Sequence, residues 1–223
     1  MAAFSDQHAD EEINPWHEQK QQEYTFLSYV FYRQEILDLF FSWIFVSLAV
    51  ATAYFGYTGW KPFALMLGIS LATVGIGVLF HELGHKIVAQ FFGFKAQFIA
   101  YRTMLWIGLL LSIFGIVFLA PGAVYLHGHI NKKERGKIAL AGPLTNLLLA
   151  TVFLAFKGTF ILGDVDVFLF GFWINALLAL FNMIPFFIFD GKKVWDWNKP
   201  IYFVVTGIAT IYNFLYYLVF LPK

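Results

Sequence analysis

Residues 75–85 read Gly-Ile-Gly-Val-Leu-Phe-His-Glu-Leu-Gly-His and stand inside an apolar run that extends from residue 62 to residue 92. In a helix with 3.6 residues per turn, His81 and His85 lie on one face, about 40° apart around the axis. Glu82 projects about 100° from His81. Two imidazoles placed in this way can bind one metal ion, with Glu82 near enough to hold a water molecule on that ion.

The composition indicates that this run lies in a membrane. Of the 223 residues, 60% are hydrophobic and only 13% are charged, whereas a water-soluble domain carries about 25% charged residues. An ionisable residue such as Glu82 inside a membrane span costs at least a few kcal/mol and usually marks a functional site. A metal site is therefore a stronger interpretation of this motif than a solvated surface cluster.

Charge and cysteine content exclude several other classes of protein. The formal net charge is +1, and no basic run is long enough to neutralise a row of phosphates, so nucleic acid is excluded as a partner. The chain has no cysteine. Any metal must therefore be bound by histidine and carboxylate side chains.

The amino-terminal residues 1–38 are expected to form a polar and amphipathic segment. Residues 1–22 are acidic and polar, which does not fit a cleavable signal peptide. Residues 24–40 alternate aromatic side chains with Arg33, Glu35 and Asp38, which indicates either an amphipathic helix at the headgroup level or an extended start of the first span. Residues 39–223 are predicted to form a single membrane-embedded domain.

Six apolar runs are long enough for a hydrocarbon core of about 30 Å, at residues 39–57, 62–92, 98–126, 137–156, 165–189 and 201–221. If all six cross the bilayer, the 15 Lys and Arg residues divide seven to eight between the two sides. If residues 98–126 enter and leave on one side, only Lys61, Lys157 and Lys223 lie opposite the other twelve. The excess of basic residues on the cytoplasmic side of membrane proteins favours this second topology.

The predicted fold is therefore an all-α polytopic membrane protein with five to six transmembrane helices and a re-entrant element at residues 98–126. Gly108, Gly115, Pro121 and Gly122 interrupt this element, and residues 123–126 have the composition of a strand. Because lipid offers no hydrogen bonds, such backbone must be covered by protein or line a watery cavity.

A catalytic zinc site has three protein ligands and an exchangeable water, so a third ligand is needed. The acidic candidates at the edges of the apolar runs are Asp164, Asp166 and Asp190. The first two resemble caps at the start of a span. Asp190 follows Pro185 and precedes Gly191, residues that break a helix and can aim a carboxylate inward.

Three further polar residues need an interpretation. Asn146, in the segment Gly142-Pro143-Leu-Thr-Asn146 at the head of a span, either joins helices or contacts a substrate carbonyl, and Asn182 carries the same ambiguity. Lys86 follows the histidine motif directly and is expected to extend toward the headgroups.

Taken together, the order His81-Glu82-x-x-His85, Gly142-Pro143-x-x-Asn146 and Asn182-x-x-Pro185-x-x-x-x-Asp190-Gly191 resembles the site-2 protease family of intramembrane zinc metalloproteases. The resemblance implies one zinc ion per chain, bound by His81, His85 and Asp190, with Glu82 as the catalytic base. It implies that Asn146 and Asn182 border the substrate. Lys192 stands where the family often has a second glycine, and no stretch is long enough for the PDZ or CBS domains of many members.

The expected activity is hydrolysis of a peptide bond within or near a transmembrane segment of a membrane protein. The expected place is a multi-pass protein of the cell membrane, with the zinc site near the cytoplasmic side. One rival is another class of membrane zinc protease, which takes a glutamate from a later helix as third ligand. The other is a zinc-binding membrane scaffold or transporter without proteolytic activity.

Overall fold

The computed structural model of the chain describes residues 22–55, 60–118, 120–186 and 188–220. Within these residues the protein is mostly helical, and three short hairpins accompany the helices. Four helical segments are long and apolar enough to cross a membrane: Arg33–Tyr54, Pro62–Phe91, Lys132–Ala155 and Lys199–Leu218. Two shorter apolar helices are Arg102–Ser112 and Val167–Asn182. These features agree with the predicted polytopic membrane protein.

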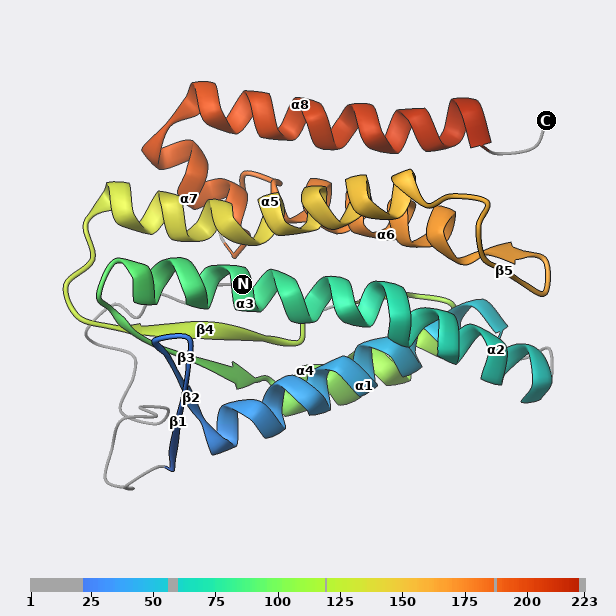
Figure 1. The fold of residues 1–223 in the computed structure, drawn as a ribbon, viewed down its shortest axis with the longest axis horizontal. Coiled ribbons are helices and arrows are strands. Elements are labelled where there is room, and N and C mark those ends of the chain that lie inside the picture. The colour runs from blue at the N-terminus through green and yellow to red at the C-terminus, as the bar shows by residue number, and fades with distance from the viewer. Residues whose placement is uncertain (1–21, 56–59, 119, 187, 221–223) are drawn as a thin grey trace.

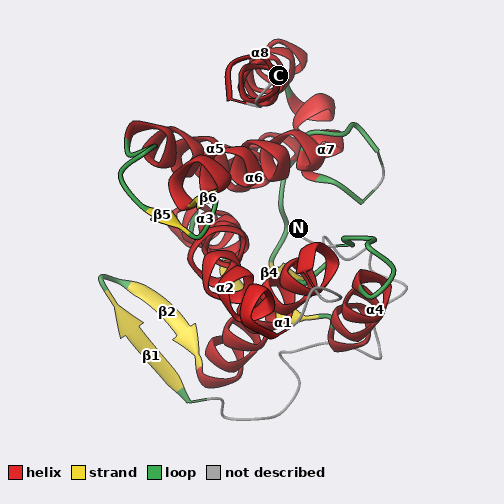
Figure 2. Cartoon of the chain, turned by 90° about the vertical axis from the view of Figure 1, so that its right-hand side faces the viewer, coloured by secondary structure: helices red, strands yellow, loops and turns green. Residues whose placement is uncertain are grey.

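The long helices lie side by side in layers, with α8 (Lys199–Leu215) outermost, α5 (Lys132–Ala155) and α6 (Val167–Asn182) next, then α3 (Ile76–Phe91), and α1 (Arg33–Phe55) on the opposite side (Figures 1 and 2). The helix α2 (Trp60–Ser70) continues through a π-helical turn, η1 (Leu71–Gly75), into α3. Successive long segments run in opposite directions (Figure 1). One hydrophobic core joins α1, α3 and α6, and a second joins α5, α6 and α8.

Polar residues at the helix starts explain where several helices begin. Asn131 caps α5 by accepting from the backbone N–H groups of Lys133 and Glu134, and the Glu134 side chain bonds back to the Asn131 N–H. Asp166 caps α6 in the same manner, as its position at the start of that run predicted. These side chains satisfy N–H groups that have no partner inside the helix.

Residues 98–126 do not form a long helix. Strand β3 (Lys95–Ala100) is followed by helix α4 (Arg102–Ser112) and then by strand β4 (Gly122–His127). The two strands pair antiparallel, from Lys95 opposite His127 to Ala100 opposite Gly122. The segment of residues 95–127 therefore begins and ends side by side, at the Lys95–His127 pair. The prediction of strand structure near residues 123–126 is confirmed, whereas β3 and α4 were not predicted.

The amino-terminal side of the fold decides between the two alternatives for residues 24–40, the amphipathic helix and the extended start of the first span. Strands β1 (Glu23–Phe26) and β2 (Tyr29–Tyr32) form an antiparallel hairpin, and α1 begins directly after it at Arg33. Of the two alternatives for residues 24–40, the structure therefore shows the extended start of the first span up to Tyr32 and a helix only from Arg33. Gln90 of α3 explains part of this arrangement, because its side-chain amide bonds both the N–H and the C=O of Val30 in β2.

The prediction that Lys86 extends toward the headgroups is also wrong. Its ammonium is buried and donates to Glu35 Oε2 at 2.7 Å and to the Ala96 carbonyl at 2.8 Å. Glu35 Oε1 in turn accepts from the Phe98 N–H at 3.0 Å. The polar residues of α1 thus point inward because they pair with α3 and β3, a long-range arrangement that local sequence does not reveal.

The predicted helix break at Pro185, near the end of the fifth apolar run, is confirmed. Helix α6 ends at Asn182, before Pro185, and a new helix, α7 (Asp190–Trp197), begins at Asp190. A carboxylate in the first turn of a helix is favourably placed relative to the helix dipole. The remaining described elements are the short pair β5 (Ile161–Leu162) and β6 (Val165–Asp166), and a terminal π-helical segment, η2 (Tyr216–Phe220).

Candidate metal centre

The structure brings His81, His85 and Asp190 together. His81 and His85 lie one turn apart on α3, and α7 delivers Asp190 from far along the chain; all three are buried. One ligand atom from each residue lies within 4.8 Å of the other two. Among the described residues, this is the one group of three His, Asp or Glu side chains close enough to bind a single metal ion. Sequence spacing predicted the histidine pair and the candidate Asp190, and the fold places them at one point.

The distances in this cluster suit a metal ion. His81 Nε2 lies 3.1 Å from His85 Nε2, and Asp190 Oδ2 lies 3.3 Å from the first and 3.0 Å from the second. Three atoms that each bind one zinc ion at about 2.0–2.1 Å with tetrahedral angles are about 3.3 Å apart. The observed spacing is therefore close to that of a tetrahedral site.

The other ring nitrogens of both histidines are already in hydrogen bonds. His81 Nδ1 lies 2.6 Å from Asn146 Oδ1, and His85 Nδ1 lies 2.7 Å from the Ile138 carbonyl oxygen. A carbonyl oxygen can only accept, so each Nδ1 carries the proton and each Nε2 presents a lone pair. Partners of this kind orient histidine ligands in metal proteins.

Gly142 of α5 leaves room in front of the two imidazoles. A Cβ at this position would lie 2.5 Å from His85 Nε2 and 2.6 Å from His81 Nε2. The side of the cluster that faces α5 is thus kept open by the absence of a side chain. Gly142 and Pro143 lie inside α5, which begins at Lys132, so the expectation that they start the helix is wrong.

The carboxylate of Asp190 is held in its charged form. Lys193 Nζ donates to Asp190 Oδ1 at 3.1 Å, while Oδ2 faces the histidines. An ionised carboxylate with one oxygen toward two imidazole lone pairs is a suitable cation ligand.

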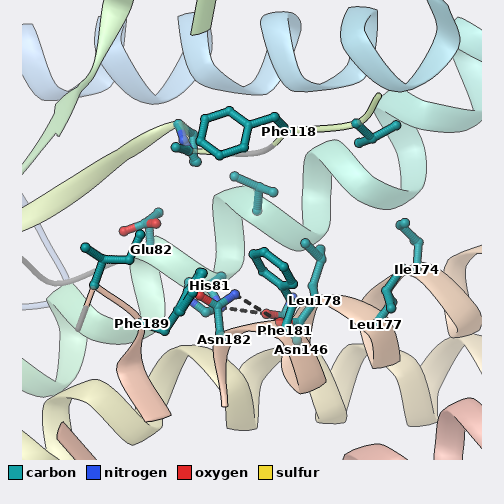
Figure 3. Close-up of a pocket in the computed structure, with 15 residues that line it drawn as sticks. His81, Glu82, Phe118, Asn146, Ile174, Leu177, Leu178, Phe181, Asn182 and Phe189 are labelled. Carbon is teal, nitrogen blue, oxygen red and sulfur yellow. Dashed lines mark hydrogen bonds between the residues drawn. The ribbon is translucent and has the colours of Figure 1, made fainter. Parts of the chain in front are cut away.

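A cavity of about 330 Å³ opens beside the cluster. His81 and Glu82 lie toward one end of it and Ile174 and Leu177 toward the other (Figure 3). Four of its lining residues are polar, namely His81, Glu82, Asn146 and Asn182. The remaining lining residues are apolar and come from α3, α6, the segment before β4 and the segment before α7.

Comparison with known proteins gives the family. Residues 69–164 match the sequence profile of peptidase family M50. A protein of Methanocaldococcus jannaschii named "Putative zinc metalloprotease MJ0611" is 42% identical over 192 residues, which cover 83% of this chain and 95% of that protein. The chain belongs to peptidase family M50. This is the site-2 protease family that the three motifs predicted.

A second M. jannaschii protein, named "Zinc metalloprotease MJ0392", is 29% identical to this M50 peptidase over 126 residues. That match covers 53% of this chain and 31% of the longer protein. No solved structure matches the chain. The sequence relatives therefore establish the family.

In this M50 peptidase, Asn146 and Asn182 both line the cavity, but their surroundings differ. Asn146 is fully buried and uses its amide within the protein, on His81, on the Gly77 carbonyl and on Asn175. Asn182 is partly exposed, and its amide nitrogen donates to the Leu178 carbonyl of its own helix. Contact of either residue with a substrate stays a prediction.

Sequence reasoning missed Asn175, an amide buried in the middle of α6. A signal for it was available, because an uncharged polar side chain inside an apolar run is costly unless it forms hydrogen bonds. Sequence reasoning also missed the Ile138 carbonyl as partner of His85. No local pattern marks a backbone carbonyl for such a role, since every residue has one.

Proposed function

We propose that this M50 peptidase is an intramembrane zinc metalloprotease that hydrolyses a peptide bond within or near a transmembrane segment of a membrane protein. The observation that carries the proposal is the buried cluster of His81, His85 and Asp190 at the wall of an apolar cavity, inside a bundle of membrane-length helices. A soluble peptide substrate would not need an apolar cavity at this depth.

One zinc ion per chain would be held by His81 Nε2, His85 Nε2 and Asp190 Oδ2. The donor set of two neutral imidazoles and one carboxylate leaves a fourth position for water, as in catalytic zinc sites. A zinc ion bound there lowers the pKa of its bound water toward neutrality and polarises a carbonyl oxygen. His85 and His81 are held in the ligand tautomer by Ile138 and Asn146.

Glu82 would act as the general base and acid. It follows His81 on α3, is buried and lines the cavity beside His81. Its carboxylate would take a proton from the attacking water and then deliver that proton to the amine nitrogen that leaves. Because the site is shielded from bulk water, the proton that Glu82 takes from the water molecule stays on Glu82 until the leaving amine accepts it.

The substrate would bind as an extended chain. An α-helix with side chains is about 10–12 Å wide and hides its carbonyls in its own hydrogen bonds. The cavity of about 330 Å³ suits apolar side chains of an unwound segment. We place that segment along β4, because Ala120 and Pro121, just before this strand, line the cavity, whereas α1 carboxylates already bond the outer edge of β3.

The proposed topology has five crossings and one re-entrant element, in a single membrane domain. Its predicted range was residues 39–223, and α1 extends it to Arg33. The crossings are α1, the α2–η1–α3 segment, α5, α6 and α8, and the re-entrant element is β3–α4–β4. Lys132, Lys133, Lys192 and Lys193 lie at the end of the bundle that holds the start of α5 and α7. The positive-inside tendency supports our proposal that this end, and with it the zinc site, lies near the cytoplasmic face.

The test measures zinc content and cleavage of a generic single-span substrate in detergent, for the wild type, Glu82→Gln and Asp190→Ala. We expect the wild type to bind about one zinc ion and to cut, Glu82→Gln to bind zinc without cutting, and Asp190→Ala to lose zinc. Cleavage by Glu82→Gln at the wild-type rate would overturn the role of Glu82. Zinc retained by Asp190→Ala would favour the rival class with a glutamate ligand, and zinc transport without cleavage would favour the transporter.

A further inference from the structure

A line of amide groups connects His81 to the backbone of α6. His81 Nδ1 lies 2.6 Å from Asn146 Oδ1, and Asn146 Nδ2 donates to Asn175 Oδ1 at 3.1 Å. Asn175 Nδ2 donates to the Gly171 carbonyl at 2.9 Å. Asn146 and Asn175 are both fully buried, and the line crosses from α3 through α5 to α6.

Two backbone carbonyls fix the direction of every bond in this line. The Gly171 carbonyl can only accept, so Asn175 must turn its NH₂ group toward it and its oxygen toward Asn146. The Gly77 carbonyl, 3.0 Å from Asn146 Nδ2, likewise demands the NH₂ group of Asn146. Asn146 therefore presents its oxygen to His81, which must carry its proton on Nδ1.

Packing holds Asn175 in this orientation. A Cβ at Gly77 would collide with Asn175 Oδ1, so the absence of a side chain on α3 is what lets the amide reach Asn146. The neighbouring residue Ile174 lines the cavity, whereas Asn175 is absent from its wall. Asn175 thus has no contact with the space proposed for the substrate and acts only through Asn146.

We infer that Asn175 is a positioning residue that sets the Nδ1-protonated tautomer of His81 and so keeps His81 Nε2 available to the metal. The inference rests on the proposed function, since it assigns Asn175 a role in the proposed zinc site. Without the Asn175 oxygen, the Asn146 amide keeps only the Gly77 carbonyl as its orienting partner. The His81 ring then loses part of the constraint on its tautomer and rotation.

The test compares Asn175→Leu with Asn213→Leu. Asn213 is a matched control because it is also buried in an apolar helix and donates to the carbonyl four residues earlier, that of Ala209, but it lies in α8. We expect Asn175→Leu to weaken zinc binding about 10- to 100-fold, the usual range for outer partners of a metal ligand. Asn213→Leu should bind zinc like the wild type.

Kinetics separate positioning from damage to the substrate site. At zinc concentrations far above the weakened Kd, Asn175→Leu should recover a kcat within a few fold of the wild type, with an unchanged KM. A raised KM with unchanged zinc affinity would mean that Asn175 shapes the cavity instead, and would overturn the inference. Equal zinc affinity in Asn175→Leu and the wild type would do the same.

A measurement on the metal-free wild type keeps the inference testable even if Asn175→Leu does not fold. The ¹⁵N chemical shifts of the two ring nitrogens of His81 report which one carries the proton. We expect Nδ1–H in the wild type and, if Asn175→Leu folds, a mixture of the two tautomers in that variant. A proton on Nε2 in the wild type would contradict the inference, whereas a wild type that binds no zinc but has Nδ1–H would contradict only the proposed function.

Discussion

Gly142 shows how a single missing side chain can decide whether a metal fits. Its Cα lies in α5 opposite the two imidazoles, and a methyl group there would stand 2.5 Å from His85 Nε2, in the space that a bound ion would need. Glycine has no side chain that could form a hydrogen bond or carry a charge. Its contribution to the site is volume alone, and this gives a prediction that leaves all three proposed ligands in place.

Gly142→Ala should weaken zinc binding by more than about 100-fold, or about 2.7 kcal/mol, because the new methyl group meets the histidine nitrogens. Gly207→Ala in α8 is the matched control, since a Cβ there has nothing within 4 Å. Alanine in a helix interior is otherwise favoured over glycine by about 0.5–1 kcal/mol. Zinc titration of the two variants is the measurement, and wild-type affinity in Gly142→Ala would show that the ion binds elsewhere.

At the scale of elements, one buried ion pair joins α1, α3 and β3. Lys86 of α3 contacts Glu35 of α1, and both also bond the backbone of β3 through the Ala96 carbonyl and the Phe98 N–H. Because Lys86 directly follows His85 on α3, the Lys86–Glu35 pair fixes the β3–β4 hairpin relative to the helix that carries both histidines. The carboxylates of α1 thereby occupy a strand edge that would otherwise need another strand.

Glu35→Ala should lower the free energy of unfolding by about 3–5 kcal/mol, since it leaves the buried Lys86 ammonium without its carboxylate. Lys192→Ala is the control, because it removes a pair with Asp196 that is about 40% exposed on each side and should cost less than about 1 kcal/mol. Reversible unfolding in mixed micelles measures both. Equal effects of the two substitutions would contradict the structural role of the buried pair.

At the scale of the whole molecule, the β3–β4 register supports the proposed topology of five crossings and one re-entrant element. Lys95 pairs with His127, so the chain returns to its starting end before α5 begins. A chain with six crossings would instead place Lys95 and Lys133 on opposite faces. The absence of cysteine allows a direct test with single introduced cysteines.

The variants Lys95→Cys, Lys133→Cys and Lys157→Cys place one thiol each at an exposed position. We expect an impermeant thiol reagent to label the first two from the same face of sealed vesicles and the third from the other face. The physical reason is that α5 begins at Lys132 and ends at Ala155, and so carries the chain across once between the second and third positions. Labelling of Lys95→Cys and Lys133→Cys from opposite faces would refute the re-entrant element.

The predictable parts of the fold are those with a local cause. Apolar runs located the membrane-length helices, and Pro185 located the end of α6. The β1–β2 hairpin was not predictable, because four-residue strands such as Glu23–Phe26 carry too little periodicity to be told from a helix start. Asn175 escaped because its importance depends on two partners on other helices, Asn146 and the close approach at Gly77.

The sequence by itself determined that His81 and His85 share one helix face, because helical geometry fixes residues four apart wherever that helix lies. It also determined that the chain is a membrane protein, because the composition of each segment sets its free energy of transfer from water into lipid. Only the tertiary structure decided that Asp190 meets the histidines, that Lys86 turns inward to Glu35, and which nitrogen of His81 faces the cluster. These features depend on contacts between distant segments, and packing of the whole bundle is what selects them.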